Sequence, residues 1–321
     1  MKIRSRLALG IALLSVWSTV FGQAFPNKPV HIVIGFAPGG VIDAFARQLG
    51  PKLADALGQP VIIDNKPGAN GVLAMDYVAK APRDGHTIFM GALGNLSLNN
   101  LFYAKLPYDF ERDFAPVTQV NSVSFLLATN AAVPAKNVAE LISLTKARPG
   151  AVNYSSTGSG STPNLAGELF NSLASVRAAH IAYKGSGQSM TDLLAGQVQF
   201  TFDAVAIIMP QVETGKLRVL ATTGPRRLAS LPNVPTMAES LPGYEVTNWY
   251  GIVVPRGTPR EAIARIRDEV AKAVKAPDMR DKMIREGMEP IGSTPEEFGA
   301  FMKVETTKWA KVIKDSGMKI D

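Results

Sequence analysis

The stretch Phe36-Ala37-Pro38-Gly39-Gly40-Val41-Ile42-Asp43 joins an apolar run to a helical pattern. Upstream, residues 30–36 form an apolar run of strand length. Downstream, residues 43–57 place apolar side chains at the three- and four-residue spacing of a helix. The paired glycines permit positive φ angles and a close approach to the backbone. The stretch therefore predicts a buried strand, a tight turn and a helix whose first N–H groups are open to a ligand.

Strand and helix patterns alternate on both sides of this stretch. Residues 61–63 and 86–90 read as strands and residues 72–81 as a helix, an order that favours a parallel sheet covered by helices. The alternation then restarts, with helices expected over residues 137–147, 165–174 and 190–195 and strands over 152–156, 179–183, 198–203 and 217–223. Near the C-terminus, Thr258 and Thr294 each precede a proline and a glutamate, which predicts two more helices capped by these hydroxyls.

The chain is long enough for two domains, since it has 321 residues and a domain takes about 150. Residues 115–129 are apolar without a helical period, so we expect them to cross from one domain to the other, and residues 217–223 to cross back. The predicted first domain is discontinuous, with residues 25–120 and 222–321. Residues 121–221 form the predicted second domain, in an α/β fold with a cleft between the two.

The N-terminus predicts export. Lys2, Arg4 and Arg6 precede an apolar stretch of about 14 residues, which is too short to span a bilayer comfortably. We interpret residues 1–24 as a signal peptide cleaved after Gly22 or Ala24, and an uncleaved anchor is the alternative. Cleavage after Ala24 would lower the formal charge from +7 to +4.

Composition excludes several classes of site. The chain has no cysteine and three histidines, which leaves no disulfide framework, thiolate metal site or cysteine nucleophile. His31, His86 and His180 are scattered without metal-ligand spacing, so we expect no metal and no cofactor. No run of basic residues interleaved with aromatics follows the signal segment, so a nucleic-acid partner is not indicated.

Polar and glycine-rich loops follow several predicted strands, where open α/β sheets bind ligands. The turn before residue 43 leads into a helix N-terminus, which is suited to binding a carboxylate. The loop over residues 155–162 is rich in hydroxyls and carries no charge. We predict that the ligand is bound by Phe36, Ala37, Gly39, Gly40, Asp43, Asn95, Ser155, Ser156, Thr157, Ser161 and Asp203. For Asp43 the alternative is a cap of its own helix. Lys184 is the only basic residue in these loops, and we expect it at the surface, with a ligand contact as the alternative.

Sequence motifs of other functional classes are incomplete or absent. Gly158-Ser159-Gly160 begins like a dinucleotide loop, but Pro163 stands where the last glycine belongs. No Walker loop or nucleophile elbow is present. A periplasmic hydrolase with Asp43 or Asp203 as base and Ser156 as nucleophile remains an alternative, although no histidine lies near either loop in the sequence.

The chain resembles the tripartite tricarboxylate transporter substrate-binding proteins, also called Bug receptors. The resemblance rests on motifs in order along the chain: the stretch from Phe36 to Asp43 with Ala46 and Arg47, then residues 65–71, 82–87, 154–161, 183–185, 191–194, 215–218, 231–236 and 249–251. It departs from the usual family pattern at Asn164, His86 and Asn233. Asn164 lies beside the predicted pocket and puts the identity of the ligand most in doubt.

The resemblance implies a type II periplasmic binding protein fold, with two α/β domains and a ligand cleft at a two-strand hinge. It implies that the loops at residues 36–43 and 155–161 hold a carboxylate. The expected protein is a monomeric periplasmic receptor, not an enzyme. It would capture a small organic acid or amino acid and present it to membrane transporter subunits. A receptor that acts on a sensor protein without transport is the alternative.

Overall fold

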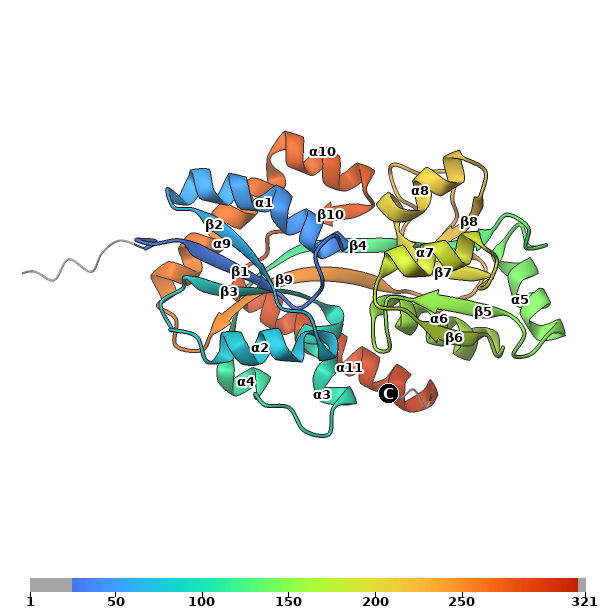
Figure 1. The fold of residues 1–321 in the computed structure, drawn as a ribbon, viewed down its shortest axis with the longest axis horizontal. Coiled ribbons are helices and arrows are strands. Elements are labelled where there is room, and N and C mark those ends of the chain that lie inside the picture. Colours follow the sequence, from blue (N-terminus) through green and yellow to red (C-terminus); the bar gives the residue numbers. More distant parts are fainter. Residues whose placement is uncertain (1–24, 317–321) are drawn as a thin grey trace, which may run out of the picture.

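A single long strand joins the two halves of the protein (Figure 1). In the computed structural model, which describes residues 25–316, β4 (Phe114–Asn130) pairs with β9 (Thr247–Pro255) up to Ser124. From Phe125 onward it pairs instead with β7 (Phe200–Ala204) and β8 (Leu217–Thr222). β4 therefore changes its pairing partners within the segment predicted to cross between domains, and the domain boundaries themselves stay a prediction.

The first half is a mixed parallel and antiparallel sheet with helices on both faces. β1 (Val30–Ile34) lies between β2 (Val61–Asn65) and β3 (Thr87–Ala92), parallel to both, and β9 follows antiparallel to β3. Alternate residues of β1 face two different cores. The helices of this half are α1 (Val41–Leu57), α9 (Arg260–Lys275) and α10 (Pro277–Arg285) on one core and α2 (Val72–Ala79) and α11 (Pro295–Ser316) on the other.

The second half repeats this arrangement on a smaller scale. β5 (Asn153–Ser156) lies between β6 (Ala179–Ala182) and β7, parallel to both. Its helices are α5 (Val138–Ala147), α6 (Thr162–Ala174), α7 (Ser186–Leu194) and α8 (Val205–Glu213). The strand order across both halves is β2-β1-β3-β9-β4-β7-β5-β6, and β10 (Met288–Pro290) also pairs with β4.

Short elements complete the described chain: η1 (Ala69–Gly71), η2 (Gly94–Leu98), α3 (Asn99–Phe102), α4 (Phe110–Asp113) and η3 (Met237–Glu239). The predicted α/β class is confirmed by this element order. Within residues 25–316, no helix is both long and apolar enough to cross a membrane. The predicted signal peptide lies outside the described residues.

Helix starts are where the sequence predictions differ most from the structure. Thr294 caps α11 as expected, since its Oγ1 accepts from the Glu297 N–H and the Glu297 carboxylate accepts from the Thr294 N–H. The prediction for Thr258 is wrong, because α9 begins at Arg260 and the Thr258 hydroxyl donates to the Pro255 carbonyl instead. α6 and α7 begin three and four residues before the predicted positions. Their first turns are polar, so they lack the apolar period on which the prediction rested.

Candidate functional site

The turn between β1 and α1 presents backbone donors to solvent. Gly40 is the N-cap residue of α1 and no side chain caps this helix. The N–H groups of the first turn, at Val41 and Ile42, therefore have no partner within the helix. Ala37 and Gly39 are exposed, and Gly39 has a φ of 85°, which a residue with a side chain would adopt only under strain. Figure 1 shows this turn at the end of the first half that faces the second.

Asp43 holds this turn in place. Its buried carboxylate accepts from the Gly39 N–H at 2.9 Å and from Arg47 Nε at 3.0 and 3.1 Å. Arg47 also donates to Asn65, whose amide donates to the Phe36 carbonyl. Burial raises the pKa of the Asp43 carboxyl, but the bonds from Arg47 and Gly39 outweigh it and hold that pKa below its ordinary value. Asp43 thus braces the turn and occupies the Gly39 N–H, but it makes no capping bond to α1, so the geometry does not bear out the alternative of a helix cap.

The second loop, between β5 and α6, uses most of its hydroxyls internally. Ser155 Oγ accepts from Ser189 Oγ at 2.8 Å, and Ser161 Oγ donates to the Gly158 carbonyl at 2.6 Å. Ser156 Oγ accepts from the Gly158 N–H at 3.1 Å. Among the described residues, the hydroxyls of Thr157 and Ser159 make no hydrogen bond, and their N–H groups are equally free. Sequence reasoning chose Thr157 as a ligand residue and did not choose Ser159, and both stay predictions of the same loop.

The helices that follow the parallel strands of the second half share one feature. α6, α7 and α8 follow β5, β6 and β7, and none of them has a side-chain cap. Since β5 is parallel to both its neighbours, the three helix starts lie at one edge of the sheet. Together with α1, both halves carry helix N-termini with open N–H donors.

Asp203 is the last residue but one of β7 at this edge and is almost completely buried. It accepts from the Ala204 N–H at 2.8 Å and from the Ser186 side chain. Burial raises the pKa of its carboxyl to about 6, because few donors compensate the charged form. Asp203 lies near Tyr250 on β9 of the first half: burial is the main reason why the pKa of the Tyr250 hydroxyl is raised, and the charge of Asp203 adds to it.

Asn95 lies where the two halves approach each other. It is buried, its Oδ1 accepts from the Ala92 N–H at 2.8 Å, and its Nδ2 has no partner among the described residues. Next to it, a Cβ placed on Gly94 would come within 3.3 Å of the Gly160 carbonyl oxygen in the second half. The loops after β3 and β5 therefore meet backbone to backbone at this point.

Residues 45–318 match the family model described as "Tripartite tricarboxylate transporter family receptor". The chain belongs to this family. A protein encoded in the tcbD-tcbE intergenic region of Pseudomonas sp. (strain P51) is 36% identical to this receptor, over 97% of the chain and 94% of that protein. Two solved structures are similar as well. "R. palustris Rpa4515 with adipate" has a TM-score of 0.88 at 35% identity, covering 92% of this chain and all of that one. "MatC (Rpa3494) from Rhodopseudomonas palustris with bound malate" has a TM-score of 0.82 at 31% identity, covering 90% of this chain and all of that one.

The receptor contains one histidine–serine pair that the sequence did not reveal. His180 Nε2 on β6 lies 2.6 Å from Ser156 Oγ, although the two residues are 24 positions apart. The Ser156 hydroxyl is 1% exposed and also bonds to Gly158. A nucleophile needs an accessible hydroxyl, so this pair does not favour the hydrolase alternative. The family is one of binding proteins.

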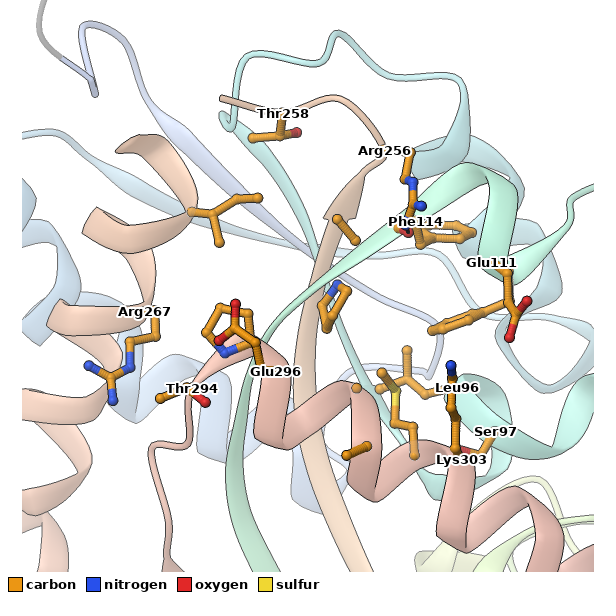
Figure 2. Close-up of a pocket in the computed structure, with 18 of the residues that line it drawn as sticks. Leu96, Ser97, Glu111, Phe114, Arg256, Thr258, Arg267, Thr294, Glu296 and Lys303 are labelled. Carbon is orange, nitrogen blue, oxygen red and sulfur yellow. Dashed lines mark hydrogen bonds between the residues drawn. The ribbon is translucent and has the colours of Figure 1, made fainter. Parts of the chain in front are cut away.

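A large groove in the described part of the receptor lies elsewhere. This groove, of about 1600 Å³, lies against α9, α11 and the start of β4 (Figure 2). Its walls carry charges of both signs, including Arg267, Glu296 and Lys303, over an apolar floor that includes Phe114. None of the predicted binding residues lines it. Within residues 25–316, no cluster of side chains is suited to hold a metal ion.

Proposed function

We propose that this protein is a periplasmic solute receptor that binds a small carboxylated organic acid between its two halves. The observation that carries the proposal is a pair of similar loops, one in each half. Residues 36–43 in the first half and residues 155–161 in the second each lead into a helix whose N-terminus no side chain caps. Each helix start contributes unpaired N–H donors and about half a positive charge.

A carboxylate fits these donors better than a neutral or cationic solute does. Backbone N–H groups at helix starts bind anions without a buried cation. A site built from backbone and hydroxyl donors leaves no unpaired charge behind when it is empty. The relatives with adipate and with malate support this class of solute. Contacts to Phe36, Ala37, Gly40, Asn95 and the other predicted residues are part of the proposal.

Closure of the two halves over the solute is the proposed mechanism. A solute that bridges both loops has a higher affinity for the closed form than for the open one, and this difference shifts the population toward closure. The proposed domains are residues 25–120 with 222–321, and residues 121–221. β4 and the chain near β9 would act as the hinge, because β4 changes partners there. A micromolar dissociation constant would correspond to about −8 kcal/mol.

The closed receptor would be recognised by membrane subunits of a tripartite tricarboxylate transporter. Family membership and the predicted signal peptide support this partner and a periplasmic location. Deleting the gene should abolish uptake of the solute. Normal uptake with an altered transcriptional response would favour the sensing alternative instead.

A thermal-shift screen tests the proposed solute class. Purified mature receptor is heated with a panel of dicarboxylates, aromatic acids, amino acids and neutral sugars. An acid that binds the folded state stabilises it, by about 2.7 kcal/mol at a concentration 100 times the dissociation constant. We expect a shift with at least one organic acid, confirmed by stoichiometric binding without turnover. Shifts with sugars only, or turnover of a bound ester, would contradict the proposal.

A further inference from the structure

The turn before α6 has its shape fixed by a side chain that follows it. Gly160 adopts a φ of 75°, and its N–H donates to Asn164 Oδ1 at 2.9 Å. Asn164 lies in the first turn of α6 and is 2% exposed. The buried side-chain amide of Asn164 is therefore hydrogen-bonded to the backbone of the predicted solute-binding loop.

The orientation of this amide is dictated by its other partner. Asn164 Nδ2 donates to the Tyr154 hydroxyl at 3.0 Å, and that hydroxyl donates to Glu168 Oε1 at 2.7 Å. Tyr154 has one hydroxyl proton, which it gives to Glu168, so its oxygen is left to accept from Asn164. A flipped amide would bring Nδ2 against the Gly160 N–H, donor against donor. The series of hydrogen bonds from Glu168 through the Tyr154 hydroxyl thus keeps Asn164 Oδ1 directed at the Gly160 N–H.

Two consequences follow for the loop. The N–H groups of Thr157 and Ser159 stay without an intramolecular partner in the described chain, whereas those of Gly158 and Gly160 are taken by Ser156 and Asn164. The Gly160 carbonyl also faces Gly94 at the point where the halves meet. Asn164 thereby takes up the Gly160 N–H and holds the residue whose carbonyl oxygen faces the first half.

We propose that Asn164 is a positioning residue for solute binding: it bonds to no solute itself and holds the turn at residues 158–161 in its binding shape. This inference rests on the proposed function, because it assigns a role within the same site. It predicts that the Asn164 amide affects affinity beyond its effect on stability.

The test compares two asparagines of α6. Asn164→Ala removes the acceptor of the Gly160 N–H. The control is Asn171→Ala, because the Asn171 amide also makes two backbone bonds, to the N–H and carbonyl of Ala178, away from the loop. With adipate as the probe in titration calorimetry, we expect the dissociation constant to rise about tenfold for Asn164→Ala, as for the loss of one hydrogen bond, and less than about twofold for Asn171→Ala. Equal changes in the two variants would overturn the inference.

Hydrogen exchange at the Gly160 amide gives a readout that needs no solute. We expect exchange to be at least about tenfold faster in Asn164→Ala than in the wild type, and unchanged in Asn171→Ala. Asn164→Asp, which keeps the acceptor, should retain protection within about threefold and serves if the alanine variant fails to fold. Unchanged exchange in Asn164→Ala, or lost protection in Asn164→Asp, would overturn the inference. If the wild type binds neither adipate nor malate while the Gly160 amide behaves as expected, these two acids are not its solutes. The bond from Gly160 to Asn164 then stands, and the affinity comparison is made with the acid that the thermal-shift screen identifies.

Discussion

Gly40 is the residue at which the first helix becomes accessible to an anion. Its φ is −76°, which any residue adopts, and a Cβ placed there would meet only the Ala37 carbonyl oxygen, at 3.7 Å. Gly39 differs, because its φ of 85° disfavours a side chain. A substitution at position 40 can therefore add a side chain to the site without straining the backbone of the turn.

Gly40→Val should weaken solute binding and leave the fold intact. The branched side chain would cover the N–H groups at the start of α1, so we expect the dissociation constant of the bound acid to rise at least about tenfold. The free energy of unfolding should change by no more than about 1 kcal/mol, since glycine is only moderately favoured at an N-cap. Titration calorimetry and urea unfolding measure the two quantities. Gly40→Ala should give an intermediate affinity, and normal affinity in the valine variant would remove this turn from the site.

Asp203 should make the stability of the protein depend on pH. Its pKa is raised from 3.8 to about 6 by burial, so the folded state binds its proton more tightly than the unfolded state does. The stability that Asp203 contributes is full below about pH 4 and is lost as the pH rises through 6, by about 3 kcal/mol at most. The Asp203→Asn variant has no carboxyl group to ionise at this position, so it should not lose this stability as the pH rises. Urea unfolding of both proteins at pH 4 and pH 7 should therefore show wild type losing stability relative to the variant as the pH rises. A constant difference between them would show that Asp203 does not titrate in this range.

At the scale of elements, the helices differ in how they begin. α5 and α11 are capped by Asn137 and Thr294, whereas α1, α6, α7 and α8 at the predicted site have no side-chain cap. A capping side chain satisfies a helix donor permanently. At these four strand–helix junctions, as also at the starts of α2, α9 and α10, no side chain takes up the first N–H donors.

Thr294→Ala should destabilise α11 by about 1 kcal/mol, because the Glu297 N–H loses its acceptor. The control is Thr307→Ala in the same helix. The exposed Thr307 hydroxyl only donates back to the Lys303 carbonyl, so its loss should cost less than about 0.5 kcal/mol. Urea unfolding measures both. A cost as large for Thr307→Ala would show that the capping assignment is wrong.

The order of elements could be predicted from the sequence, but the bonds of the site could not. The strand before Gly35 and the helix through Leu53 follow from apolar periodicity, which is a local property. Ser189 in α7 is buried, and its hydroxyl bonds to Ser155, which is 34 residues away. No local sequence pattern predicts this bond. For the same reason the sequence missed the contact of His180 with Ser156.

At the scale of the whole molecule, β4 and α11 link the two halves. β4 pairs within both, and α11 packs on β4 of the first half and on α6 of the second. The Glu305 carboxylate of α11 also accepts from the indole N–H groups of Trp249 on β9 and Trp309. Relative motion of the halves would therefore be a bend about continuous elements.

Small-angle scattering should show this motion. The radius of gyration of the receptor should fall when a bound acid reaches saturation, because the solute stabilises the closed form. Gly40→Val at the same acid concentration should show little change. An unchanged radius with stoichiometric solute bound would reject closure as the mechanism.

The sequence by itself determined the alternation of strands and helices, the places where loops leave the carboxyl ends of strands, and the resemblance that the family match confirmed. These depend on residues that are neighbours along the chain. Only the tertiary structure decided which donors remain free: Gly39 is taken by Asp43, Gly160 by Asn164, and Thr157 and Ser159 are left open. The physical reason is that each backbone N–H forms its bond with whichever acceptor the folded chain brings within about 3 Å, and that depends on turn geometry and burial that composition and periodicity do not encode.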